Sequence, residues 1–105
     1  MAQQSKQNIS ASVQSILDKI VETCKSEENV VQILLYGSRA RGLAMERSDI
    51  DIAVIGRNID IEKLRDEVDK IDTLLKIDLV DLSRCKNELL RSEVSKDGIS
   101  IFNKV

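Results

Sequence analysis

Residues 34–56 read LLYGSRARGLAMERSDIDIAVIG, and this stretch decides the fold of the chain. An apolar run ends at the turn Gly37-Ser38, a basic stretch follows, and the pair Asp49-x-Asp51 then opens a second apolar run. A small turn can expose backbone N–H groups to phosphate oxygens. Two carboxylates at i and i+2 on a strand point to the same face, where they can bind a divalent metal together. The segment therefore combines two features that phosphoryl chemistry needs.

The hydrophobic pattern predicts one α/β (α+β) domain at residues 9–105, preceded by a disordered polar tail at residues 1–8. Helical periodicity predicts helices from Ser10 to about Glu27, from Asn58 to Lys76, and from a Ser83 cap to about Ser95, the last with Leu89, Leu90 and Val94 facing inward. Apolar, β-branched runs predict strands at 30–36, 50–55, 77–82 and 99–102, with a brief helix at 38–44. We therefore expect a sheet of about four strands with helices packed on it. The link between the first two strands is short for a parallel crossover, which favours a mixed sheet.

The composition excludes several classes of function. The 105 residues carry a net charge of −2 and 2% aromatic side chains, so strong nucleic-acid binding is not expected. The chain has no His, which removes Ser-His-Asp catalysis and the usual zinc ligands, and its two cysteines form no metal-type pair. No apolar run approaches membrane-spanning length and no signal-type segment is present. We expect a cytoplasmic protein without a membrane segment.

A third carboxylate is expected to join Asp49 and Asp51. Asp78 lies in KIDLVDL, the third predicted strand, and an aspartate inside an apolar strand is costly unless it is paired or binds a metal. If the second and third strands are neighbours, Asp78 lies beside Asp51, and carboxylates so clustered need a cation such as Mg²⁺. Two such ions can clamp the attacking and leaving oxygens of a phosphoryl transfer. Asp81 is the alternative third carboxylate, although its position in the strand places it on the opposite face.

The turn after the first strand is a predicted phosphate-binding element. Gly37 lets the backbone approach a phosphate closely, and amides at a helix start near Ser38 favour anions. Arg39, Arg41 and Arg47 lie close by in the sequence and can neutralise phosphate charge. They can equally be surface or ion-pair residues, and the turn taken alone also fits an ordinary strand-to-helix connection.

GSRARG followed by SDID resembles the signature of the DNA polymerase β-like nucleotidyltransferase superfamily. More narrowly, the chain resembles the minimal nucleotidyltransferase (MNT) family over nearly its whole length, which implies a nucleotidyltransferase fold. The resemblance implies that Gly37 and Ser38 hold the NTP phosphates. It implies that Asp49 and Asp51 bind two Mg²⁺ ions. It also implies that Asp78 completes the metal site and helps to activate the acceptor hydroxyl.

The same resemblance implies a partner. Minimal nucleotidyltransferases are commonly antitoxins paired with a HEPN-domain ribonuclease toxin, and they are thought to transfer AMP from ATP to a toxin tyrosine. We therefore expect Mg-dependent AMP transfer within a hetero-oligomer, because so short a chain has little room for its own acceptor-binding domain. Two alternatives stay open. One is a non-catalytic subunit that blocks a toxin by contact, and the other is transfer to a small molecule or an RNA end.

Overall fold

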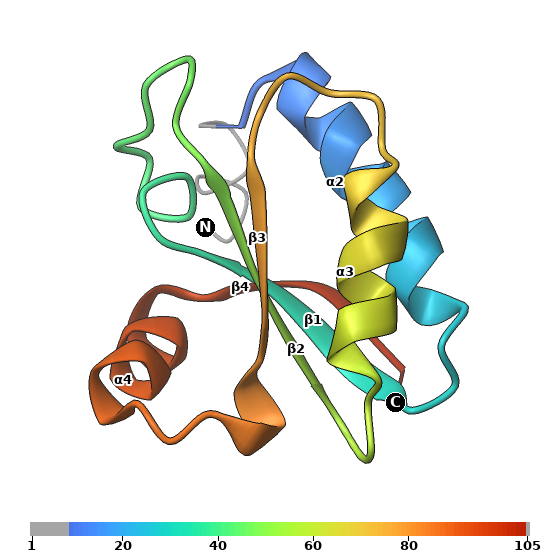
Figure 1. Ribbon diagram of the computed structural model, residues 1–105. Coiled ribbons are helices and arrows are strands. Elements are labelled where there is room, and N and C mark those ends of the chain that lie inside the picture. Colours follow the sequence, from blue (N-terminus) through green and yellow to red (C-terminus); the bar gives the residue numbers. More distant parts are fainter. Residues whose placement is uncertain (1–8, 105) are drawn as a thin grey trace.

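A mixed four-stranded sheet forms the centre of the molecule in the computed structural model, which describes residues 9–104 (Figure 1). The strands are β1 (Val30–Tyr36), β2 (Ile50–Gly56), β3 (Ile77–Asp81) and β4 (Ile99–Asn103), in the spatial order β3-β2-β1-β4. β1 is antiparallel to β2 and β4, whereas β2 and β3 are parallel. The expectation of a mixed sheet is confirmed. The tail predicted at residues 1–8 lies outside the described residues.

Helices cover the two faces of this sheet unequally. α2 (Ala11–Lys25) and α3 (Ile61–Asp69) lie together on one face, and α4 (Glu88–Asp97) covers part of the other (Figure 1). A short 3-10 helix, η1 (Leu82–Arg84), connects β3 to the segment before α4. One sheet face is therefore closed, and the other is covered by a single helix.

Alternation along β2 separates the core from the functional face. Ile50, Ile52 and Val54 are fully buried in the main core, toward α2 and α3. Ala53 has the opposite orientation and forms a smaller buried cluster with Tyr36 and Val94 of α4. Because side chains alternate along a strand, Asp51 shares the α4 side of the sheet with Ala53. The isoleucines at positions 50 and 52 therefore face the core, and Asp51 faces away from it.

The helix predicted at 38–44 is wrong, because the chain forms a series of turns there. Gly37 and Gly42 have φ of 77° and 74°, in the left-handed region, which interrupts a right-handed helix. The Arg41 N–H still donates to the Gly37 carbonyl at 3.2 Å, but the Leu43 N–H reaches back to Ser38 at 2.9 Å. Since β1 and β2 are antiparallel neighbours, the link has to reverse direction and a straight helix would not do so.

The second predicted helix is too long, and the third was predicted to begin too early. α3 ends at Asp69, where the N–H of Lys70 bonds back to Glu67 and Val68, and the chain then runs as a loop into β3. Ile71 and Leu75 in this loop still pack against the core, which explains why they mimic helical periodicity. The loop brings the chain back to the start of β3, parallel to β2.

Ser83 does not cap a long helix. Its hydroxyl accepts a hydrogen bond from the Gly56 N–H at 2.8 Å, so it ties the end of β2 to η1. Asn87 caps α4 instead, accepting from the Leu90 N–H at 3.2 Å. Leu89 was expected to face inward, but it is 84% exposed. Because α4 begins only after η1 and a short loop, Leu89 lies in its first turn, and the buried residue of α4 is Val94.

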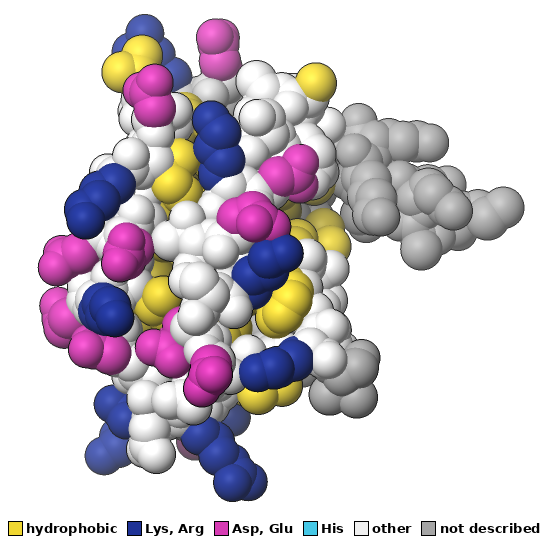
Figure 2. All heavy atoms as spheres, turned by 90° about the vertical axis from the view of Figure 1, so that its right-hand side faces the viewer, with side chains coloured by type: hydrophobic (Ala, Val, Ile, Leu, Met, Phe, Trp, Pro, Cys, Tyr) yellow, Lys and Arg dark blue, Asp and Glu magenta, His cyan; other side chains and the backbone are white. Residues whose placement is uncertain are grey.

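The outer surface of α2 and α3 mixes both signs of charge. Figure 2 shows acidic and basic side chains interspersed over this face, with small apolar areas between them. No single-sign patch is visible on the side that this view shows. None of the helices in the described part of the chain is long and apolar enough to cross a membrane.

Candidate active site

Two of the predicted carboxylates meet on adjacent strands. Asp51 of β2 is paired in register with Asp78 of β3 on one side and with Tyr36 of β1 on the other. Asp49 is exposed and lies just before β2 begins. The sequence placed Asp78 beside Asp51 on the condition that the second and third strands are neighbours, and the structure meets this condition.

Asp81 has a different environment from this pair. It is in register with Val54, whose side chain lies in the main core, and it is itself 7% exposed. Its Oδ1 accepts a hydrogen bond from the Ser83 N–H at 3.0 Å, and Arg84 lies 3.8 Å from its Oδ2. These contacts give Asp81 a structural role at the end of β3.

The carboxyl group of Asp51 is costly to ionise in this position. Burial raises the pKa of the Asp51 carboxyl above its usual range, and the charge of Asp78 raises it further. Asp49 and Glu93 act in the same direction on this pKa, whereas Lys76 lowers it. The Nζ of Lys76 is 3.6 Å from Asp78 Oδ1, but both side chains are substantially exposed, so this ion pair compensates little. A cation bound here would remove the repulsion.

Gly37 links the turn to the carboxylates. It follows Tyr36, the register partner of Asp51, and its φ of 77° is one that L side chains rarely adopt. A Cβ on Gly37 would collide with Oδ2 of Asp51. The predicted phosphate-binding turn and the predicted metal-binding carboxylate are therefore packed directly against each other.

Arg39 and Arg41, two of the three arginines named as candidates to neutralise phosphate charge, differ in their surroundings. The guanidinium of Arg39 is buried and donates to the carbonyl oxygens of Met45, Glu46 and Ser48, the last at 2.7 Å. These contacts brace the loop between β1 and β2 and do not point to a phosphate. Arg41 is exposed, and within the described residues no side-chain hydrogen bond or ion pair holds it.

Tyr36 and Glu93 also belong to the neighbourhood of Asp51, although the sequence reasoning missed both. The pKa of the Tyr36 phenol is raised to about 12, first by burial and then by the charges of Asp51 and Glu93. Tyr36 could have been found from the sequence, because it immediately precedes the Gly-Ser turn. Glu93 could not, because only the packing of α4 on the sheet brings it there.

The donor set suits a hard divalent cation. Every carboxylate named here offers oxygen, which is the ligand type that Mg²⁺ prefers. Among residues 9–104, no three acidic or cysteine side chains already form a metal-binding group. The residues still fit a magnesium ion, because their donors are oxygen atoms and because strand register brings Asp51 and Asp78 together. A bound nucleotide would have to complete the coordination.

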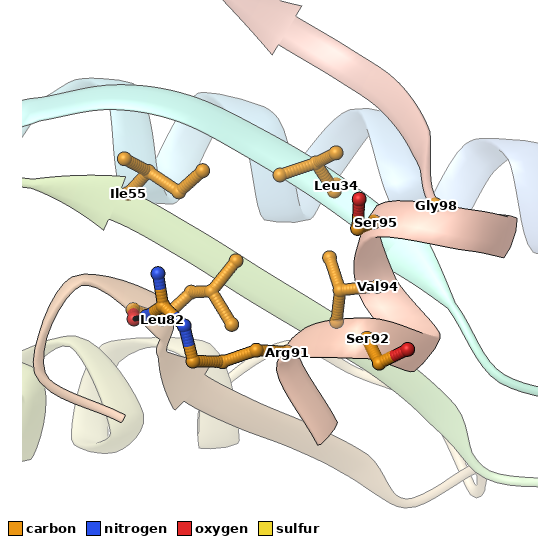
Figure 3. Close-up of a pocket in the computed structure, with 8 residues that line it drawn as sticks. All are labelled: Leu34, Ile55, Leu82, Arg91, Ser92, Val94, Ser95 and Gly98. Atoms are coloured by element: carbon orange, nitrogen blue, oxygen red, sulfur yellow. Dashed lines mark hydrogen bonds between the residues drawn. The ribbon is translucent and has the colours of Figure 1, made fainter. Parts of the chain in front are cut away.

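A cavity between α4 and the sheet contains none of the predicted site residues in its lining. It has a volume of about 510 Å³ and lies between Leu34, Ile55 and Leu82 of the sheet region and Val94 of α4 (Figure 3). Arg91 lines it, but the guanidinium is held by the carbonyl oxygens of Leu82 and Cys85. No carboxylate lines this cavity, so we place the chemistry at Asp51 and Asp78.

Comparison with known proteins defines the class. Residues 18–105 match the family model described as "Polymerase beta, Nucleotidyltransferase", and the chain belongs to this nucleotidyltransferase family. A protein of Methanocaldococcus jannaschii named "Putative protein adenylyltransferase" is 43% identical over 47 residues, which are 43% of this chain and 32% of that protein. The match thus spans about a third of that relative. The resemblance found in the motifs is confirmed.

Solved structures support the same fold. A toxin–antitoxin structure with AMP-PNP has a TM-score of 0.60 at 26% identity, covering 85% of this chain and 72% of that one. A tri-AMPylated Shewanella oneidensis HEPN toxin in complex with an MNT antitoxin gives 0.58 at 25% identity, covering 86% and 71%. A Sulfolobus solfataricus nucleotidyltransferase structure gives 0.56 at 24% identity, covering 86% and 79%, and shows the fold alone.

Proposed function

We propose that this chain transfers AMP from ATP to a hydroxyl group of a partner protein, with Mg²⁺ as cofactor, and that the acceptor is a tyrosine of a HEPN-domain toxin. The observation that carries the proposal is the register pairing of Asp51 with Asp78, with Gly37 packed against the Asp51 carboxylate. The relative named as a protein adenylyltransferase and the AMPylated toxin complex support a protein acceptor. The structure with AMP-PNP supports an adenine nucleotide as substrate.

The residues then have distinct roles. The turn at Gly37 and Ser38 would bind the outer phosphates through backbone N–H groups and the Ser38 hydroxyl. Asp49, Asp51 and Asp78 would hold Mg²⁺, which when bound neutralises charge on the phosphates and on the carboxylates themselves. Arg41 is exposed near the turn and would pair with phosphate. We assign no such contact to Arg39, whose guanidinium is engaged in the loop.

The reaction forms a bond between the acceptor oxygen and the α-phosphorus and breaks the bond from that phosphorus to the bridging oxygen, so pyrophosphate leaves. The hydroxyl proton passes to a carboxylate. We assign this role to Asp78, the outer member of the Asp51–Asp78 pair. Such chemistry depends mainly on positioning and electrostatics.

The test uses the full chain and a HEPN-domain protein from the same organism, for which the neighbouring reading frames are the first place to look. Incubation with Mg²⁺ and ATP should add the mass of AMP to a tyrosine of that protein. Asp51→Asn should abolish the gain, because it removes a charge from the carboxylate pair. Asp66→Asn is the matched control, since Asp66 is exposed on α3 and away from the site, and it should transfer normally. Full transfer by Asp51→Asn would show that the site is wrongly assigned.

The main alternative is inhibition of the toxin by contact alone. It predicts that an Asp49→Ala/Asp51→Ala variant neutralises the toxin as well as the natural chain does, with no gain of mass. The presence of paired carboxylates that repel each other favours catalysis, because binding of a toxin by contact alone does not require that arrangement.

A further inference from the structure

Two loops at the same end of the sheet hold large apolar side chains in solvent. One loop precedes β2 and carries Leu43 and Met45, which are 70% and 79% exposed, and the other precedes β3 and carries Leu74, which is 105% exposed. Both loops lie at the upper end of the sheet in Figure 1, on either side of the start of β2 and β3. Single exposed apolar residues are ordinary, but grouped ones mark contact surfaces.

A groove of about 570 Å³ runs between these loops. Its lining is Glu46, Arg47, Asp49, Leu74, Leu75 and Lys76, and we call it the loop groove. Asp49 belongs to the proposed site, and Lys76 Nζ lies 3.6 Å from Asp78 Oδ1. The loop groove is therefore continuous with the carboxylates. A ligand seated in it would lie next to the place where AMP is transferred.

Met45 borders the loop groove: it lines a second hollow, which shares Glu46 and Leu75 with the groove. The loop segment that carries Met45 is held in a defined conformation. Arg39 donates to the carbonyl oxygens of Met45, Glu46 and Ser48, and the Met45 N–H donates to Ser48 Oγ at 2.8 Å. Ordering this segment before binding lowers the entropy that a partner has to overcome. The exposed methionine is thus presented by a braced loop.

The charges of the loop groove indicate what it receives. Arg47 and Glu46 are exposed, and within residues 9–104 neither side chain has a hydrogen bond or ion pair. A carboxylate on the partner would complement Arg47. A nucleic-acid backbone fits poorly, because Glu46 and Asp49 would repel its phosphates. Arg and Met are also enriched in protein–protein interfaces.

We propose that the loop groove and the adjoining hollow at Met45 dock the acceptor protein, through a segment that places apolar side chains against Leu74 and Met45 and a carboxylate opposite Arg47. This inference rests on the proposed function, because it names the surface that delivers the acceptor hydroxyl to the same site. Docking at the groove would fix the distance from the partner to the carboxylates, which transfer requires.

The experiment measures binding and transfer separately. Affinity for the HEPN-domain protein is measured by calorimetry without ATP, and the KM for that protein is measured in the AMP-transfer assay. Met45→Ser/Leu74→Ser should weaken binding at least tenfold and raise the KM by a similar factor. Leu89→Ser is the matched control, because Leu89 is equally exposed but lies on α4, and it should change affinity less than twofold. Thermal melts of both variants should match that of the natural chain.

A charge reversal tests the second contact. Arg47→Glu should weaken binding at least threefold, and this loss should diminish at high salt. Unchanged affinity and KM in the Met45→Ser/Leu74→Ser variant, with AMP transfer intact, would overturn the docking inference and leave the proposed function standing. So would a dimer of the chain alone that dissociates on these substitutions, because a second copy would then fill the groove. Absence of transfer by the natural chain would instead count against the proposed function, while the binding measurement would still decide the docking inference.

Discussion

Gly37 couples backbone conformation to the chemistry of the site at the scale of a single residue. Gly37→Ala should lower the affinity for ATP at least tenfold, because the new Cβ would push the Asp51 carboxylate aside. Gly42→Ala is the control: its φ of 74° is nearly the same, but it lies in the exposed part of the loop. Each should cost about 1 kcal/mol of stability from the strained φ. Equal ATP affinities in the two variants, measured by calorimetry, would show that the turn is only structural.

The pKa of Asp51 makes stability depend on pH in a defined direction. Its folded pKa is raised, so its contribution to stability is complete below the unfolded value of about 3.9 and is lost as pH rises through the folded pKa. Asp51→Asn removes this loss. Without metal, the melting temperature of the variant should gain on that of the natural chain as pH rises from the unfolded value of about 3.9 through the raised folded pKa. A difference that stays constant or reverses over this range would contradict the assigned environment.

Tyr36 is a built-in reporter of the same environment, because it is the only tyrosine in the chain. Because burial and the nearby charges raise the pKa of Tyr36 to about 12, the absorbance of its phenolate should rise at a pH well above the usual midpoint of about 10. The phenol's contribution to stability is present below its unfolded pKa of about 10 and is lost as pH rises through the folded value. Asp51→Asn should lower this midpoint. An ordinary midpoint near 10 in the folded protein would mean that the ring is not buried beside the carboxylates.

The connection between β1 and β2 contains turns instead of a helix or strand, and the buried guanidinium of Arg39 holds it together. Arg39→Ala should lower the free energy of unfolding by about 2–4 kcal/mol, because it removes charge-assisted bonds to three loop carbonyls. Arg41→Ala should change it by less than about 0.5 kcal/mol, since Arg41 is exposed. Urea unfolding measures both. A small effect of Arg39→Ala would indicate that the loop holds its shape without the arginine.

The whole molecule depends on the closed face of the sheet. Ile52 is fully buried at the centre of β2, so Ile52→Ala should destabilise the protein by about 2–5 kcal/mol. Leu43→Ala, at an exposed site, should change stability by about 0.5 kcal/mol or less. Similar losses for the two variants in urea unfolding would contradict the arrangement of the core. The face that only α4 covers, in contrast, contributes less to stability and carries the proposed site.

Local patterns in the sequence were enough to predict the central motif and the order of the elements, except for the wrongly predicted helix at 38–44. Period-two alternation around Asp51 separates core from solvent locally, so a reader of the sequence can assign each face of β2. The Gly-Ser turn and the aspartate pair are likewise local patterns. The extents of the helices were predicted less well, because Ile71 and Leu75 contact the core from a loop with helical spacing.

Only the tertiary structure decided which distant groups meet. Pairing of β2 with β3 selects Asp78 over Asp81 as the neighbour of Asp51, and the packing of α4 brings Glu93 to the same place. Folding likewise determines which groups Arg39 contacts, since its partners are loop carbonyls whose positions no local pattern specifies. The physical reason is that strand pairing and side-chain burial are long-range outcomes of the whole chain, whereas alternation and turn chemistry are properties of a few consecutive residues.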